Sequence, residues 1–179
     1  GSNDGTMTNG ATTAPGKVGD AISLFKKDDY VEVPSNPSLQ FDPSTPFSIE
    51  GWINIESYPA NDTVPIVAKW GGQSPEFGYG LLVDVNKKIQ FSLDMFSCCR
   101  NNVTGTSDIL ANTWNHFAAT YDGIIMRIYV NGALEGSETR TVGGTNGSDS
   151  PLYIGNQIFI TAGDVFTVLI DELGIYSGV

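Results

Sequence analysis

The chain has 179 residues, with 21 glycines, 9 prolines and only 16% charged side chains. This composition favours a single extracellular β-domain over a helical cytosolic enzyme. The formal net charge of −11 and the nine scattered basic residues argue against nucleic-acid binding, because phosphate binding depends on Lys and Arg. No apolar run approaches the roughly 18 residues of a membrane helix, so we expect no membrane insertion. We expect one domain over residues 1–179, excised from a larger multi-domain protein.

Alternating apolar and polar residues predict strands along the whole chain. In residues 47–55, Phe47, Ile49 and Ile53 fall on one face, and Glu50 and Trp52 fall on the other. A period of two places each apolar set on one face of a sheet, so two such sheets can pack about 10 Å apart. The predicted strands lie at residues 5–7, 20–25, 29–33, 47–55, 64–70, 78–84, 88–95, 114–121, 124–130, 133–141, 151–155 and 165–176.

Residues 112–132 carry the clearest local signal. Two apolar runs are separated by Asp122-Gly123 and closed by Asn131-Gly132. Asp-Gly and Asn-Gly supply the positive φ that tight hairpin turns need. This segment therefore predicts three consecutive antiparallel strands.

Several short strings in order resemble one family. They are the segment NDGTMTNGATTAPGKVGDAISLFKKDDYVEVP, the strand PFSIEGWINI, the turns Tyr-Asp-Gly and Val-Asn-Gly, and the closing strings PLYIGN and IDELGIY. Together they resemble the laminin G-like, concanavalin A-like jelly-roll domains. The resemblance implies an all-β, antiparallel two-sheet jelly-roll sandwich. It also implies a binding module rather than a catalyst.

A calcium ion is one implication of this resemblance, because related jelly rolls often bind Ca²⁺ through Asp, Asn and carbonyl oxygens. Asp28 and Asp29 precede a predicted strand, and Asp171 lies in the last one. If the fold brings the first and last strands together, these acids can share an ion. The alternative is a rim of solvated acids on an acidic protein.

Catalytic chemistry finds little support. Glucanases that share this sandwich use a tight Glu-x-Asp-x-x-Glu strand, and the chain has no such spacing. His116 is the only histidine, and for it we expect a structural role. Cys98 and Cys99 are adjacent, so a bridge between them would be strained. The bridged form, two free thiols and intermolecular pairing all stay open.

The glycine-rich segment WGGQSPEFGY is the predicted ligand site. Its aromatic residues Trp70, Phe77 and Tyr79 can stack on sugar rings, and Arg100 and Asn156 can join them from neighbouring loops. The alternative is that Trp70 and Tyr79 belong to the edge of the core.

These observations favour a non-catalytic carbohydrate-binding or glycoconjugate-binding module of a secreted or cell-surface protein, serving adhesion or enzyme targeting. The alternative is a structural or protein-interaction module of an adhesin. A glycoside hydrolase is the least favoured of the three.

Overall fold

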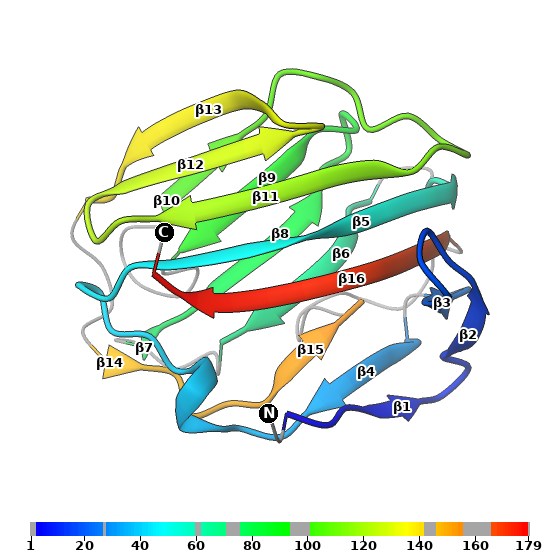
Figure 1. The fold of residues 1–179 in the computed structure, drawn as a ribbon, viewed down its shortest axis with the longest axis horizontal. Coiled ribbons are helices and arrows are strands. Elements are labelled where there is room, and N and C mark those ends of the chain that lie inside the picture. Colours follow the sequence, from blue (N-terminus) through cyan, green and yellow to red (C-terminus); the bar gives the residue numbers. More distant parts are fainter. Residues whose placement is uncertain are drawn as a thin grey trace.

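The computed structural model describes residues 3–26, 28–59, 62–70, 76–93, 101–141, 146–155 and 166–178, with Glu76, Phe77 and Asn146 described by their backbone. Within these ranges the chain forms two antiparallel sheets of seven strands each. Figure 1 shows one of them, here called sheet B and containing residues 47–57, in front of the other, here called sheet A and containing residues 64–69. The predicted all-β, two-sheet jelly-roll architecture is therefore confirmed.

The strands of the two sheets interleave along the sequence, as a jelly roll requires. Sheet A has, in spatial order, β1 (Thr6–Thr8), β4 (Tyr30–Val33), β15 (Leu152–Ile154), β6 (Val64–Lys69), β8 (Tyr79–Val83), β9 (Ile89–Leu93) and β10 (Asn101–Thr104). Sheet B has β13 (Ala133–Thr139), β12 (Ile125–Val130), β11 (Asn115–Tyr121), β5 (Phe47–Ser57), β16 (Thr167–Ser177), β3 (Asp20–Leu24) and β2 (Thr12–Pro15). Beside them lie the 3₁₀ helix η1 (Pro37–Leu39) and a short parallel pair, β7 (Glu76–Phe77) with β14 (Asn146–Gly147).

An aromatic cluster centred on Phe47 joins the sheets. The Phe47 ring stacks on Phe41 with centroids 4.5 Å apart, and it meets Phe91 of sheet A edge-on at 6.0 Å. It also contacts Tyr121 on the neighbouring strand β11 at 5.9 Å. All four side chains are buried, so this contact fixes which face of β5 points inward.

The two predicted hairpins are present. Asn131 and Gly132 both have positive φ, at 49° and 83°, and join β12 to β13. At the other turn, Gly123 has a φ of 95° and the Asp122 carboxylate accepts the Ile125 amide at 2.7 Å. The turn chemistry therefore sets the β11–β12–β13 meander, as the sequence predicts.

Each predicted strand has a counterpart within a few residues, but β2, β10 and the short pair β7 and β14 were not predicted. The β2 sequence TTAP has no apolar alternation, and β10 reads NNVT with a single buried apolar side chain. β2 pairs with β3 and β10 pairs with β9, and in each pair the partner strand has the apolar alternation. The end of the predicted strand 88–95, residues 94 and 95, lies outside the described residues.

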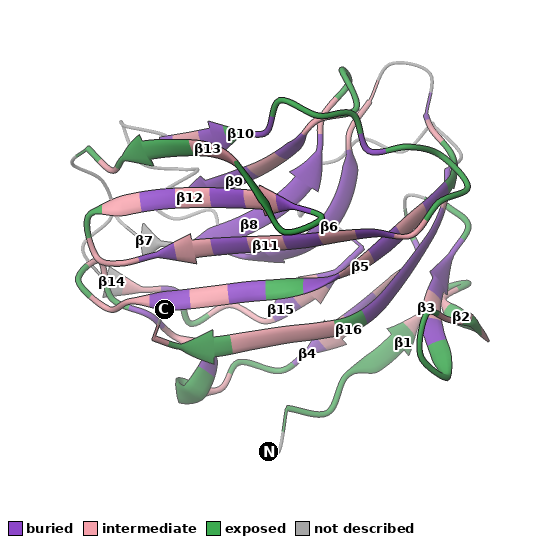
Figure 2. Ribbon diagram, turned by 45° about the horizontal axis from the view of Figure 1, so that its top comes forward, coloured by how far each residue is buried: buried purple, intermediate pink, exposed green. Residues whose placement is uncertain are grey.

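The faces that point away from the core, here called outer faces, differ between the sheets. On sheet A, Ala68, Leu82 and Ser92 point outward by alternation, yet each is at least 96% buried. On sheet B, the outward residues of β5, β11 and β12 are half-buried or exposed, as the alternating colours of Figure 2 show. A flat surface open to solvent therefore lies on sheet B. In the described part of the chain, no helix has the length and apolarity needed to cross a membrane.

The loop that follows β10 is attached to β13 by Glu135. Its carboxylate accepts the Thr106 and Ser107 amides at 2.9 and 2.8 Å, and both hydroxyls as well. These hydrogen bonds, led by the two hydroxyls, lower the pKa of Glu135 to about 2.

Glu135→Gln should therefore change the acid limb of the stability curve. A carboxylate with a depressed pKa stabilises the folded chain above the unfolded value, about 4.5, and loses that contribution as pH falls toward 2. We expect the variant to melt below the wild type at pH 6 and the difference to shrink between about pH 4.5 and 2. Glu138→Gln, an exposed position on the same strand, is the control. A difference that persists unchanged at low pH would contradict this role.

Candidate functional site

Two of the predicted ligand residues, Trp70 and Tyr79, are not exposed. Trp70 and Tyr79 are 98% and 99% buried. The Trp70 ring covers the outer face of sheet A at Gly80, where an added Cβ would come within 2.3 Å of it. The Tyr79 hydroxyl donates to the Leu39 carbonyl at 3.0 Å, and burial raises the pKa of Tyr79. For these two residues the alternative expectation, a place in the core, is the one the structure supports.

The remaining predicted ligand residues cannot be placed as side chains. Phe77 is described by its backbone in β7, and Arg100 and Asn156 lie outside the described residues, as do Cys98 and Cys99. Their roles stay predictions.

Two of the three acids predicted to bind calcium, Asp29 and Asp171, have carboxylates that hold backbone amides. Asp28 is exposed, whereas Asp29 is fully buried. The Asp29 carboxylate accepts backbone amides of Gly10 at 2.8 Å, Phe25 at 3.0 Å and Lys26 at 3.2 Å. These bonds tie the β1–β2 and β3–β4 connections together.

Asp171 holds a different loop. Its carboxylate accepts the amides of Val18 and Glu172, each at 2.8 Å, and so attaches the β2–β3 hairpin to β16. Within the described residues, no three His, Cys, Asp or Glu side chains lie close enough together to hold a metal ion. The expected calcium site stays a prediction, and the described geometry does not fit it.

An open site does exist on the outer face of sheet B, built on the central strand β5. Its neighbours β11 and β16 align with it in three cross-strand rows. The rows are His116–Trp52–Asp171, Ala118–Glu50–Gly174 and Thr120–Ser48–Tyr176. The aromatic side chains Trp52, His116 and Tyr176 lie in the two end rows, and the middle row has Glu50 between the small residues Ala118 and Gly174.

Tyr176 forms one wall. Its side chain is 52% exposed, and the ring lies against Gly174, where an added Cβ would come within 2.3 Å of the hydroxyl and 2.6 Å of ring atoms. A glycine at position 174 therefore lets the ring fold back along the strand. The result is a fixed aromatic side chain on an exposed surface, which is the kind of group that stacks on sugar rings.

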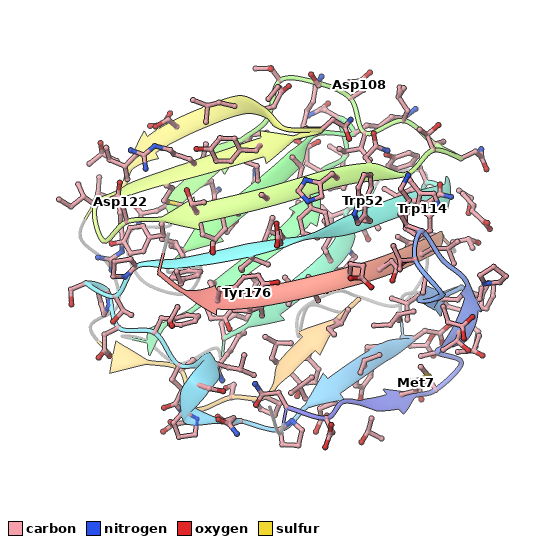
Figure 3. All side chains as sticks on the ribbon, in the orientation of Figure 1. Met7, Trp52, Asp108, Trp114, Asp122 and Tyr176 are labelled. Carbon is pink, nitrogen blue, oxygen red and sulfur yellow. The ribbon has the colours of Figure 1, made fainter. Side chains whose placement is uncertain are left out.

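Trp52 and His116 form the opposite wall. Their rings meet edge-on with centroids 5.1 Å apart, and the Lys17 ammonium lies 4.6 Å from the Trp52 ring centroid. His116 Nε2 is also 3.7 Å from a carboxylate oxygen of Glu50. Figure 3 shows Trp52 and Tyr176 on the same side of sheet B, projecting from β5 and β16.

A β-bulge places one more carboxylate at the site. Between Asp171 and Gly174, β16 has one residue more than the facing part of β5, and Glu172 takes a φ of +48°. Bulges re-aim side chains, and a non-glycine residue in this region is strained, so both features are typical of functional positions. The Glu172 side chain is exposed.

These groups surround a cavity of about 250 Å³. We call it the outer-face site; it is lined by Val18, Glu50, Gly51, Trp52, His116, Glu172 and Tyr176. Its volume is just below the roughly 300–1,000 Å³ of most small-molecule sites. It combines aromatic walls with hydrogen-bond acceptors and is chemically suited to a polyhydroxylated ligand.

Two other surfaces have weaker claims. A larger cleft of about 630 Å³ is lined by Lys88, Asp108 and Glu135 among others, but Lys88 already pairs with Asp108 at 2.6 Å and Glu135 holds a loop. On sheet A, Tyr30 and Tyr153 meet edge-on at 5.6 Å. Burial first, and then Glu32 and Tyr30, raise the pKa of Tyr153.

The outer-face site was not predicted as a unit. The alternation of residues 47–55 predicts Trp52 and Glu50 on the face opposite the core, but Tyr176 and Glu172 had no signal of their own. The alternation of 47–55 combined with the closing strand would have pointed to this face. His116, expected to be structural, lies half-exposed at the site wall.

Tyr79→Phe separates a core role from a binding role. The variant keeps the ring and loses the hydroxyl, so the buried Leu39 carbonyl loses its donor. We expect the free energy of unfolding to fall by about 1 kcal/mol in a urea titration, with sugar binding unchanged. Weakened binding with unaltered stability would instead return Tyr79 to the ligand site.

Calcium should have little effect on this domain. The Asp29 carboxylate accepts three backbone amides and that of Asp171 accepts two, so both already hold loops of the fold in place. We expect the melting temperature to be the same in excess Ca²⁺ and in EDTA, whereas Asp29→Asn should destabilise the fold by about 1–3 kcal/mol. A saturable rise in melting temperature with Ca²⁺ would support the metal site instead.

Comparison with known proteins places this fold in context. Mouse pappalysin-1 is 27% identical over 105 residues, which are 56% of this chain and 6% of that protein. The binding domain of Paraclostridial Mosquitocidal Protein 1 is 17% identical with a TM-score of 0.78, over 98% of this chain and 44% of that one. The chain thus spans under half of that binding domain and a small fraction of pappalysin-1.

Two solved structures carry sugars according to their descriptions. Domain 4 of AbnA, a GH43 extracellular arabinanase from Geobacillus stearothermophilus in complex with arabinotriose, is 20% identical with a TM-score of 0.71, over 97% of this chain and 82% of that one. The binding domain of Botulinum Neurotoxin DC in complex with SialylT is 18% identical with a TM-score of 0.74, over 99% and 44%. At such identities the likeness concerns the fold.

The family assignment rests on the sequence itself. A laminin G family model of the concanavalin A-like lectin/glucanases superfamily matches residues 25–179, from the end of β3 to the last residue. This range includes β5, β11 and β16, the three strands that build the outer-face site. The chain belongs to the concanavalin A-like lectin/glucanases superfamily.

Proposed function

We propose that this domain is a non-catalytic glycan-binding module whose ligand occupies the outer-face site. The observation that carries the proposal is the position of Tyr176. Its exposed ring is held against Gly174, opposite Trp52, with Glu50 and Glu172 at the same cavity. An aromatic face packs on sugar C–H groups, while carboxylates accept hydroxyl hydrogen bonds.

The comparisons support glycan ligands in general and do not bear on the charge of the ligand. Two domains of the same fold are described in complex with arabinotriose and with SialylT, respectively. The likeness to AbnA domain 4 is the more informative, because this chain covers 82% of that one. By this analogy the parent protein is secreted or surface-attached, and the module serves adhesion or the targeting of an attached enzyme.

A protein-interaction module is the second candidate function. Leu110 is 59% exposed and lines the larger cleft, and Leu134 is 56% exposed and follows Ala133 of the same cleft on β13. Exposed apolar side chains beside a cleft are common at protein interfaces. This surface is separate from the outer-face site, so substitutions at the two surfaces distinguish the functions.

Tyr176→Ala tests the glycan proposal. We expect the wild type to bind at least one neutral trisaccharide from a panel of arabinotriose, xylotriose, cellotriose, maltotriose and mannotriose, with micromolar-to-millimolar affinity by calorimetry. The variant should lose about tenfold in affinity, because an aromatic contact contributes roughly 0.5–1.5 kcal/mol. Its melting temperature should stay near that of the wild type, since the ring is half exposed.

Phe25→Ala is the matched control, because Phe25 is also aromatic and 45% exposed but does not line the site. It should leave the affinity unchanged. A trisaccharide that binds Tyr176→Ala as tightly as the wild type would place the ligand elsewhere. Silence across the panel would favour the protein-interaction module.

A further inference from the structure

The charges at the outer-face site restrict which glycans can bind there. Two carboxylates line the cavity: Glu50 from β5 and Glu172 from the bulge of β16. Asp171, also on β16, is buried and accepts the Val18 and Glu172 amides, so it does not line the cavity. The site is therefore acidic on two of its three strands.

Two basic groups lie at the site, and each contacts a neighbouring side chain. The Lys17 ammonium lies over the Trp52 ring, 4.6 Å from its centroid. His116 Nε2 faces the Glu50 carboxylate at 3.7 Å. Neither is placed as the bidentate donor that carboxylate or sulfate recognition uses, which Arg supplies best. The chain's net charge of −11 adds a repulsive field for any approaching anion.

Hydroxyl groups suit the same residues. An ionised carboxylate is acceptor-only and offers about four lone-pair sites, whereas each sugar hydroxyl can donate. Glu50 and Glu172 can thus accept from hydroxyls of a sugar that packs on Tyr176. A sugar carboxylate brought to the same position has no proton to donate, and it meets like charge.

We infer that the outer-face site takes uncharged sugars and excludes glycans whose sugars carry carboxylate or sulfate groups. The inference rests on the proposed function and names the ligand class of that same site. Two like charges about 4 Å apart near a protein surface repel strongly enough to lower affinity by roughly tenfold or more. The site would thus discriminate between neutral and acidic sugars by repelling the acidic ones as well as by contacting the neutral ones, and specificity often combines both effects.

A matched pair of ligands tests the inference. The probes are the neutral trisaccharide that binds the wild type in the panel, and the same trisaccharide with its primary hydroxyls oxidised to carboxylates. For xylotriose, whose pyranose rings have no primary hydroxyl, the reducing end is oxidised to a carboxylate instead. We expect the oxidised form to bind about tenfold more weakly at low salt. Added salt should narrow the gap by screening the repulsion, while affinity for the neutral form stays constant.

Charge-removing variants locate the effect. Glu50→Gln and Glu172→Gln should each reduce the ratio of neutral to acidic affinity, because each removes one repelling charge while keeping an acceptor oxygen. Glu56→Gln is the matched control: it removes the same charge from the same strand, six residues from Glu50 and outside the cavity lining. Its ratio should equal that of the wild type.

The outcomes separate the two proposals. Equal or tighter binding of the oxidised trisaccharide overturns the charge selection and leaves glycan binding standing. A preference that Glu50→Gln and Glu172→Gln do not alter also overturns it, since the discrimination would then come from another place. Silence toward both probes overturns the proposed function and the inference together.

Discussion

The packing of the Phe47 ring between the two sheets is the constraint on which the rest of this structure depends. Phe47 begins β5 and contacts aromatic rings on η1's exit loop, on sheet A and on β11. Because side chains alternate along a strand, burying Phe47 commits Ile49 and Ile53 to the core and Glu50 and Trp52 to the outer face. A one-residue slip would exchange the two sets. The core and the candidate site are thus opposite faces of the same strand.

β16 contributes the other side of the site, with Glu172 and Tyr176. Its bulge at Asp171–Gly174 inserts one residue, which turns Glu172 outward while Asp171 binds the amide of Val18 in the β2–β3 hairpin. That hairpin also brings Lys17 over Trp52. After the bulge, Gly174 leaves room for the Tyr176 ring. The cavity therefore depends on three features: the bulge in β16, the attachment of the β2–β3 hairpin by Asp171, and the absence of a side chain at Gly174. Regular strand pairing alone would leave this surface flat.

Much of the fold could be predicted from the sequence, because alternation and turn chemistry act over a few residues. The Asn131-Gly132 turn and the apolar face of 47–55 are examples, and the family resemblance supplied the two-sheet order. The site could be predicted only in part. Trp70 and Tyr79 look like ligand residues in a glycine-rich segment, yet Trp70 packs over Gly80 and Tyr79 packs on Phe47.

The residues of the outer-face site come from four separated segments, and their proximity depends on strand order and on the bulge register. The sequence around Tyr176 and Glu172 indicates neither the strand order nor the position of the bulge. The same limit applies to Asp29 and Asp171, whose acidic side chains suggested a metal but accept backbone amides from distant loops. The roles of Asp29 and Asp171 depend on which distant loops lie beside them, and a single sequence does not show those contacts.

The most direct test of the central claim is a map of the bound glycan on the folded domain. In a ¹H–¹⁵N correlation spectrum titrated with the neutral trisaccharide that binds, the indole N–H of Trp52 and the amides of Gly174 and Tyr176 should shift together along one binding isotherm. The indole of buried Trp70 should stay in place. Shifts confined to Tyr30 and Tyr153, or to the cleft of Lys88 and Asp108, with Trp52 and Tyr176 unmoved, would contradict the assignment of the ligand to the outer face of sheet B.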